Sequence, residues 1–176
     1  MSDKNIVLIG MPGSGKTTIG RLLAKRLNRE FCDIDEYIEK IEDKKISDIF
    51  KDGEDAFRKI EIKVVADISK REEMIISTGG GVIKFSQNID NLRKNGIIIF
   101  IDRPVEDIVS DVNTSTRPLL RDGAEKLHDL YSQRYTLYKE YADYIVSNTS
   151  TLRSAVEEIL NIIYKNRGEE VEIYSD

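Results

Sequence analysis

The chain has 176 residues and a formal net charge of −5 at pH 7, from 27 Lys and Arg against 32 Asp and Glu. General polyanion binders carry a basic excess, so this charge disfavours nucleic acid as a partner. No apolar run approaches the roughly 20 residues of a membrane-spanning helix, so we expect no membrane partner. One cysteine and one histidine exclude an internal disulfide framework and a His/Cys zinc site.

The length is that of one ordinary domain, and we expect that domain to occupy residues 1–166. The first five residues lead directly into a short apolar run without the features of a signal peptide, so we expect a cytoplasmic protein. We also expect it to be a monomer. Residues 113–123 mix polar side chains with Pro and Gly and predict a mobile lid. Residues 167–176 form an acidic tail that we expect to be disordered.

Short β-branched runs alternate along the chain with longer segments of helical period. Strands are predicted at residues 5–9, 30–34, 74–77, 97–101 and 144–147. Helices are predicted at residues 16–27, 36–42, 54–70, 88–94, 105–112, 124–141 and 152–166, with a short helical turn at 47–50. Strands that alternate with helical crossovers form a parallel sheet covered on both faces, so the sequence predicts a three-layer α/β/α fold around five parallel strands.

Residues 10–17 read GMPGSGKT and match the pattern G-x-x-x-x-G-K-[ST] between a predicted strand and a predicted helix. The glycines let backbone amides face phosphate oxygens, and the helix N-terminus adds its dipole. Lys16 would place a positive charge on the β- and γ-phosphates, and the Thr17 hydroxyl is a hard oxygen ligand suited to Mg²⁺. The loop predicts a nucleoside triphosphate site made by Gly13, Ser14, Gly15, Lys16, Thr17 and Thr18.

The rest of the sequence narrows the class of phosphate-loop protein. A GTPase switch needs N-K-x-D and D-x-x-G, but the chain has no Asn-Lys dipeptide and no glycine with Asp three residues before it. Motor ATPases and helicases need a strand that ends in Asp, whereas the strand at 74–77 runs into Thr-Gly-Gly-Gly. The remaining class is a compact kinase with an acceptor pocket and a lid.

Two acidic side chains, Asp33 and Asp35, close the second predicted strand. Alternate residues at a strand end lie on the same side, and the carboxyl ends of parallel strands border the ligand crevice. One Asp could act through the Mg²⁺ shell while the other accepts a hydrogen bond from a substrate hydroxyl. Alternatively, Asp35 is the N-cap of the helix that follows.

The remaining candidates are spread along the chain. Arg58 and Glu61 are neighbours on a helix, which is also typical of a surface ion pair. The triple-glycine turn (residues 79–81) exposes bare backbone on which a small ligand could lie, or forms a flexible loop. Arg117 lies in the predicted lid, where a positive charge would arrive on closure. Arg134 follows on the next helix, and Arg suits bidentate binding of a carboxylate.

Taken together, these motifs resemble the shikimate kinase family. Their order is G-x-x-G-x-G-K-T, D-x-D, F-R-x-x-E, G-G-G, R-P-L-L and R-x-x-L-Y, at residues 10–17, 33–35, 57–61, 79–81, 117–120 and 134–138. The resemblance runs from about residue 5 to about residue 160. It implies the strand order 2-3-1-4-5 and an ATP- and Mg²⁺-dependent transfer of phosphate to the 3-hydroxyl of shikimate, in aromatic amino-acid biosynthesis.

The resemblance also implies a role for each matching residue. Lys16 would hold the β- and γ-phosphates, Thr17 would bind Mg²⁺, and Asp33 would reach the metal through water. Asp35 would hold the acceptor hydroxyls and serve as general base. The other implied contacts are Arg58 and Arg134 on the shikimate carboxylate, Gly79, Gly80 and Gly81 on the ring, Phe50 and Phe57 as apolar walls, and Arg117 on the nucleotide from the lid.

One position departs from the family pattern, and two other functions remain open. Many members carry an arginine seven residues before the lid arginine, where it stacks on adenine, but here that residue is Ser110. Arg153 could substitute from another direction, or it is a solvated residue of the last helix. The competing functions are another metabolite kinase, such as a gluconate kinase, and a non-catalytic nucleotide-binding regulator.

Overall fold

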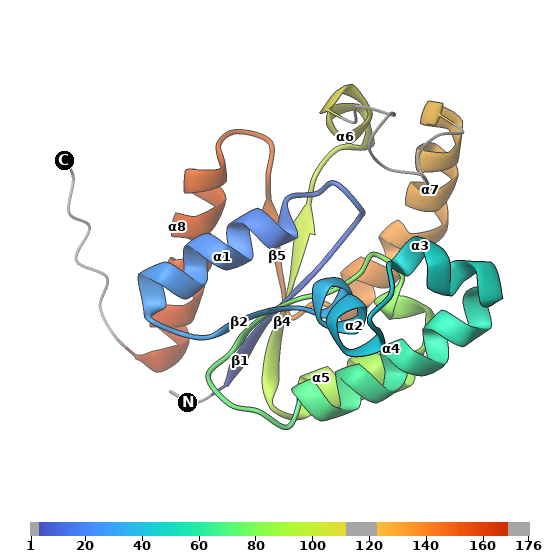
Figure 1. Ribbon diagram of the computed structural model, residues 1–176. Coiled ribbons are helices and arrows are strands. Elements are labelled where there is room, and N and C mark those ends of the chain that lie inside the picture. Colours follow the sequence, from blue (N-terminus) through green and yellow to red (C-terminus); the bar gives the residue numbers. More distant parts are fainter. Residues whose placement is uncertain (1–3, 112–122, 169–176) are drawn as a thin grey trace.

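The computed structural model describes residues 4–111 and 123–168, and Figure 1 shows its sheet between two helical layers. The strands are β1 (Asn5–Ile9), β2 (Phe31–Asp33), β3 (Ile75–Ser77), β4 (Gly96–Asp102) and β5 (Tyr144–Ser147). The helices are α1 (Lys16–Leu27), α2 (Ile34–Glu42), α3 (Ile46–Ile49), α4 (Glu54–Ile68), α5 (Ser86–Lys94), α6 (Val105–Asp111), α7 (Gly123–Tyr141) and α8 (Leu152–Arg167), with 3-10 turns η1 (Phe50–Asp52) and η2 (Val82–Lys84). Within these ranges, no helix is both long and apolar enough to cross a bilayer.

The sheet is parallel throughout and has the strand order β2-β3-β1-β4-β5, which confirms the predicted fold class. The central strand β1 pairs with β3 and with β4, so that Ile6 lies beside Ile75 on one side and Ile97 on the other. The chain crosses from β2 to β3 through α2, α3 and α4, and it reaches β4 through α5. The five carboxyl ends therefore lie along one edge, where a parallel sheet of this kind binds ligands.

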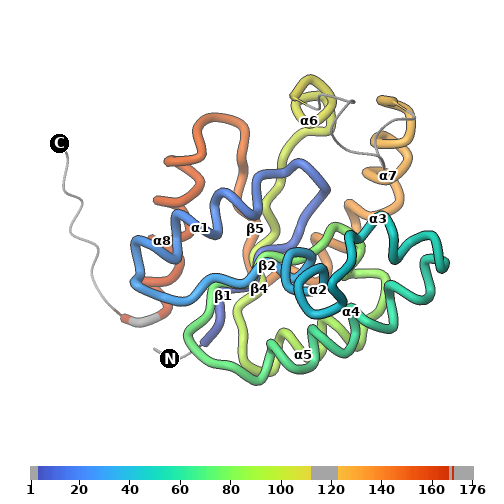
Figure 2. Tube along the Cα trace, in the orientation of Figure 1, coloured from blue at the N-terminus to red at the C-terminus, as the bar shows by residue number. Residues whose placement is uncertain are grey.

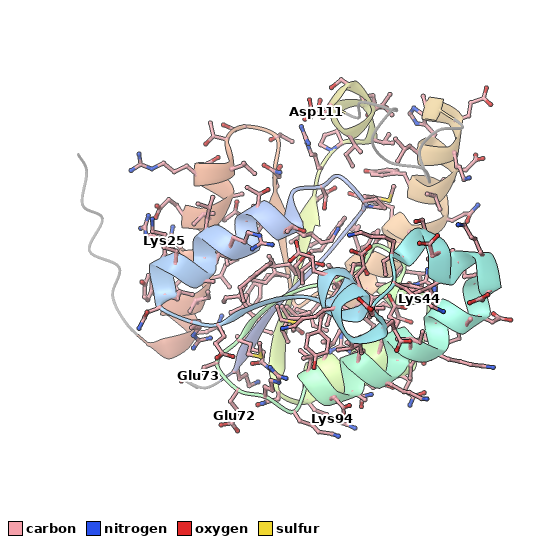
Figure 3. The ribbon with its side chains drawn as sticks, viewed as in Figure 1. Lys25, Lys44, Glu72, Glu73, Lys94 and Asp111 are labelled. Carbon is pink, nitrogen blue, oxygen red and sulfur yellow. The ribbon has the colours of Figure 1, made fainter. Side chains whose placement is uncertain are left out.

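The two faces of β1 support two separate cores, as expected for a parallel strand buried on both sides. Val7 and Ile9 point to the face covered by α2, α4, α5 and α7, whereas Ile6 and Leu8 point to α1 and α8. Figure 2 shows these two helical groups on opposite sides of the strands. Charged side chains such as Lys25, Lys44, Glu72 and Lys94 lie on the outside (Figure 3).

Most predicted elements are present, and the differences have local causes. Helix α2 begins at Ile34 rather than at residue 36, because the Asp33 side chain caps it by accepting hydrogen bonds from the amides of Asp35 and Glu36. The suggestion that Asp35 is the N-cap is therefore wrong. Leu22 of α1 is an apolar residue that stays 40% exposed. The predicted lid at 113–123 lies outside the described residues except for Gly123, as does the tail from residue 169 onward.

Candidate active site

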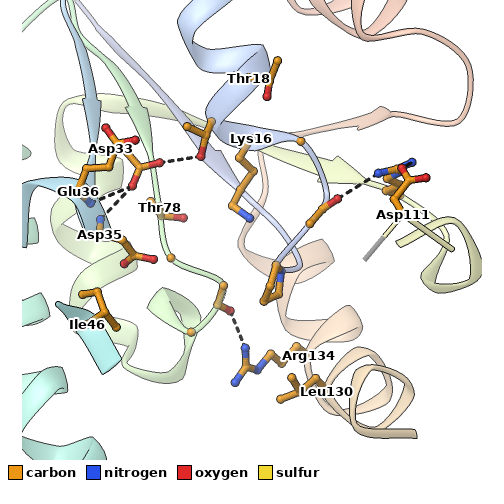
Figure 4. Close-up of a pocket in the computed structure, with 18 of the residues that line it drawn as sticks. Lys16, Thr18, Asp33, Asp35, Glu36, Ile46, Thr78, Asp111, Leu130 and Arg134 are labelled. Atoms are coloured by element: carbon orange, nitrogen blue, oxygen red, sulfur yellow. Dashed lines mark hydrogen bonds and ion pairs between the residues drawn. The ribbon is translucent and has the colours of Figure 1, made fainter. Parts of the chain in front are cut away.

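A cleft of about 1630 Å³ opens at the carboxyl edge of the sheet. Each strand delivers a different wall of this cleft: the phosphate loop follows β1, Asp33 ends β2, the triple-glycine turn follows β3, Arg103 follows β4 and Asn148 follows β5. Figure 4 shows Lys16, Asp35 and Arg134 around a common space. The topology therefore assembles in one place residues that are separated by more than one hundred positions in the sequence.

The phosphate loop has the backbone that its glycines predict. Gly10, Gly13 and Gly15 have φ values of 147°, 82° and 99°, which residues other than glycine rarely adopt. Gly15 caps the N-terminus of α1, so the positive end of the helix dipole points into the cleft. Thr18 in the first turn is exposed and lines the cleft, and the Ser14 side chain is buried beneath the loop.

Lys16 points back into the phosphate loop, where backbone carbonyl oxygens bind its ammonium group. Lys16 Nζ donates to the carbonyl oxygens of Gly10 at 2.8 Å and Met11 at 2.7 Å, and the residue is only 7% exposed. Figure 4 places this nitrogen at the centre of the loop. Phosphate oxygens that entered the loop would compete with these two carbonyl oxygens for the Lys16 ammonium.

A second pair of polar groups lies beside the loop. Thr17 Oγ1 donates a hydrogen bond to Asp33 Oδ2 at 2.7 Å, and Ser77 Oγ lies 3.5 Å from the same hydroxyl. The other Asp33 oxygen, Oδ1, accepts the two amides that cap α2. The cap holds the carboxylate in one orientation, so the hydroxyl and Oδ2 form a rigid pair of hard oxygens.

Asp35 faces the cleft from the first turn of α2, and Lys16 faces the same cleft (Figure 4). Asp35 Oδ1 is buried and lacks a hydrogen-bond partner among the residues that the structure describes. Burial, reinforced by the negative charges of Asp33 and Glu61, raises the pKa of Asp35 to about 6. A buried polar atom without a partner is costly, so this oxygen is suited to a ligand hydroxyl.

Arg58 is not the surface residue that its sequence context allowed. It is 7% exposed, and Nη1 donates to Glu61 Oε2 at 2.7 Å, while Nε and Nη2 donate to Glu54 Oε1 at 3.1 and 3.0 Å. Glu61 is completely buried, and that burial raises the pKa of its carboxyl against the opposing effect of Arg58. Two carboxylates therefore orient one guanidinium at the wall of the cleft.

The triple-glycine turn brings backbone against these groups. A Cβ added at Gly79 would lie 2.7 Å from Asp35 Oδ1, and one at Gly81 would lie 2.1 Å from Arg58 Nη2. The Gly80 carbonyl accepts a hydrogen bond from Arg134 Nη1 at 3.1 Å and another from the Tyr138 hydroxyl at 2.5 Å. The turn thus lies against the polar side chains of Asp35 at Gly79 and of Arg58 at Gly81, whereas a Cβ at Gly80 would stand 2.7 Å from Pro12 Cδ.

The structure brings together nearly all the residues that the sequence indicated. Asp35, Arg58 and Arg134 surround one end of the cleft, and Lys16 and Thr17 lie at its centre. Phe50 and Phe57 stack at 4.8 Å between ring centroids, and both line the cleft. Arg117 lies outside the described residues.

Sequence reasoning missed several residues of the site. Arg103 lines the cleft, donates to the carbonyl oxygen of Gly13 at 3.2 Å and pairs with Asp111. Asn148 donates to the carbonyl oxygen of Ser14 at 2.9 Å from the end of β5. Their position directly after strands β4 and β5 was the available signal, since those strand ends border the crevice. Ser110 lines the same end of the cleft, whereas Arg153 is exposed and lies outside its lining.

Comparisons with known proteins agree with this geometry. The family model for shikimate kinase matches residues 12–164. A shikimate kinase of Clostridium botulinum (strain Eklund 17B / Type B) is 50% identical over 161 residues, which cover 92% of this chain and 98% of that protein.

Two solved structures give the same result in three dimensions. Shikimate kinase from Acinetobacter baumannii in complex with shikimate has a TM-score of 0.87 and 37% identity, over 93% of this chain and 94% of that one. Shikimate kinase from Aquifex aeolicus has a TM-score of 0.82 and 36% identity, over 93% and 98%. The family model and the relatives agree with the strand order and the phosphate loop, and the chain belongs to the shikimate kinase family.

Proposed function

We propose that this protein transfers the γ-phosphate of ATP to the 3-hydroxyl of shikimate, a step of aromatic amino-acid biosynthesis by way of chorismate. The observation that carries the proposal is the two-ended cleft. Lys16 and the phosphate loop line one part of the cleft, and in another part the triple-glycine turn lies against Asp35, Arg58 and Arg134. Such an arrangement suits a small hydroxy acid placed against a nucleoside triphosphate.

The nucleotide end is built from the loop amides, Lys16 and the N-terminus of α1. Phosphoryl transfer requires little covalent chemistry from the protein, so positioning and charge neutralisation supply most of the rate. Lys16 would leave the Gly10 and Met11 carbonyls for the phosphate oxygens, and its charge would offset the charge of the transferring group. Gly13, Ser14, Gly15 and Thr18 would hold the remaining phosphate oxygens.

The residues present fit a magnesium ion. Thr17 Oγ1 and Asp33 Oδ2 are hard oxygens in direct contact, in the combination of hydroxyl and carboxylate that Mg²⁺ accepts beside phosphates. Thr17 would ligate the ion directly, and Asp33, which also caps α2, would reach it through water. The bound ion would supply charge neutralisation at the β- and γ-phosphates. The protein's own part is to hold these two oxygens rigid.

The acceptor end binds and activates the substrate. Arg58 and Arg134 would bind the carboxylate, the triple-glycine turn would support the ring, and Asp35 would accept the proton of the 3-hydroxyl. The 3-oxygen forms a bond to the γ-phosphorus as the bond to the β,γ-bridging oxygen breaks, and ADP leaves with that bridging oxygen. This transfer requires Asp35 and Lys16 to face the same space, and both line the cleft.

Exclusion of water completes the proposal, because water would otherwise accept the phosphate. We assign that part to the lid at 113–123, with Arg117 reaching the nucleotide. Reaction in the cytoplasm suits both the use of ATP and the buried free thiol of Cys32. We also propose that the protein is a monomer, which light scattering would test.

The test is a coupled assay of ADP release. We expect release to depend on both shikimate and Mg²⁺, with little release when shikimate is absent. Shikimate-independent hydrolysis would indicate an ATPase, and release with gluconate alone would indicate the other kinase. Binding of ATP without any turnover would indicate a regulator. Arg58 and Arg134 suit the carboxylate of a hydroxy acid, and the match to the shikimate kinase family favours shikimate among such acids.

A further inference from the structure

Lys84, the last residue of η2, lies outside the lining of the cleft but contacts a residue that forms it. Lys84 Nζ donates to Glu54 Oε1 at 2.6 Å, across thirty positions of sequence. The same Glu54 oxygen accepts from Arg58 Nε and Nη2. One carboxylate oxygen is therefore shared between a lysine and the arginine that we assign to the substrate carboxylate.

The charges around Arg58 explain why this sharing matters. Arg58 contacts two carboxylates, Glu54 and Glu61, so without Lys84 the group has a net charge of −1. Lys84 makes the group neutral, and Arg134, for which the described residues provide no ion-pair partner, adds a positive charge to the same cleft. The hydrogen bond from Lys84 is also the largest influence that lowers the pKa of Glu54.

Lys84 also fixes the backbone on the other side of Arg58. Its amide donates to the carbonyl oxygen of Gly81 at 3.0 Å, and Gly81 is the residue whose backbone lies against the Arg58 guanidinium. The same residue thus joins the triple-glycine turn to the first turn of α4. Arg58 lies between these two attachments.

We propose that Lys84 is a positioning residue for acceptor binding: by sharing Glu54, it leaves the Arg58 guanidinium available to the substrate carboxylate. This inference rests on the proposed function. Because Lys84 acts through Glu54, its loss affects the affinity for the acceptor more than the chemical step or the binding of ATP. The Lys84–Glu54 pair is 42% and 44% exposed, so solvent limits the effect to about two- to fivefold.

The experiment compares steady-state constants for shikimate and ATP. Lys84→Met raises KM for shikimate about two- to fivefold and changes kcat and KM for ATP less than twofold, and Lys84→Arg restores the shikimate KM. Adding Glu54→Gln to Lys84→Met removes the unshared carboxylate and returns KM toward the wild-type value. Lys70→Met is the matched control, because Lys70 forms a similar exposed ion pair with Asp67, away from the cleft.

An unchanged shikimate KM in Lys84→Met, an equal rise in KM for ATP, or a double variant worse than the single one overturns the proposal. A purely structural role for Lys84 predicts the last of these, since a second substitution would then add to the damage. If Lys84→Met is unstable by thermal melting, Lys84→Gln replaces it with the same expectations. Failure of the proposed function is seen separately, as wild-type protein that shows no shikimate-dependent ADP release.

Discussion

The Asp35 carboxylate lies directly against the backbone of Gly79, so closely that a Cβ on Gly79 would stand 2.7 Å from Oδ1. The side chain that we assign as general base therefore has its position set by a residue without a side chain. Burial in this contact also leaves Oδ1 without a partner among the described residues. The contact with Gly79 thus bears both on the position of the Asp35 carboxylate and on its unpartnered oxygen.

Gly79→Ala tests this contact. The backbone of Gly79 does not have a positive φ, so the alanine itself is not strained, but its methyl group displaces the Asp35 carboxylate. Overpacking of this kind costs about 1–3 kcal/mol, and we expect kcat to fall roughly tenfold or more. KM for ATP should stay within about threefold. Unchanged kcat in a folded variant would show that the carboxylate moves freely.

Asp35→Asn should lower turnover by roughly 10²–10⁴-fold, because the amide keeps the shape but does not accept the proton. The same change should raise the melting temperature at pH 8 in metal-free buffer. The pKa of Asp35 is raised to about 6 in the folded protein from its ordinary value of 3.8, so its contribution to stability is lost as pH rises through about 6. Asparagine avoids that loss. Full activity, or a lower melting temperature at pH 8, would contradict this role.

Lys16→Met should abolish phosphoryl transfer. Its ammonium contacts the Gly10 and Met11 carbonyls rather than apolar core, so the fold should survive, as circular dichroism would show. Substantial turnover in the folded variant would refute the assignment of the phosphate loop. Lys25→Met provides the control, since Lys25 is exposed on the outer surface of the same helix (Figure 3).

Arg58→Ala and Arg134→Ala should each weaken shikimate binding, because a hydrogen bond to a charged partner contributes about 1.5–3 kcal/mol. That range corresponds to roughly ten- to 150-fold in the dissociation constant. Calorimetric titration of each variant with shikimate and with ATP separates the two ends of the cleft. Loss of ATP affinity with shikimate affinity retained would place the carboxylate elsewhere.

Arg103→Ala should raise KM for ATP and leave KM for shikimate nearly unchanged. In the proposed arrangement the acceptor binds beside Arg58, so in-line transfer would send the rest of the nucleotide away from it, toward Arg103 and Ser110, which also line the cleft. Arg103 also supports the Gly13 carbonyl of the phosphate loop. A selective effect on shikimate would reverse this orientation of the two substrates.

Local features of the sequence determined much of this protein. The β-branched runs predicted all five strands, since such residues suit a strand buried on both faces. The phosphate loop was visible because each of its residue types serves the backbone of one short segment. Asp33, Asp35, Arg58 and Arg134 were visible as members of an ordered set of motifs, and the structure places them around one cleft.

Contacts between distant segments were decided only by the tertiary structure. The division between Asp33, which caps α2 and pairs with Thr17, and Asp35, which faces the cleft, depends on where β2 ends beside the phosphate loop. Arg103 joined the site only because β4 lies next to β1 in the sheet. Lys84 and Glu54 meet across thirty positions because the triple-glycine turn packs against the start of α4. Propensities and motifs act within a few residues, whereas these pairings exist only once the strands are ordered and the helices packed.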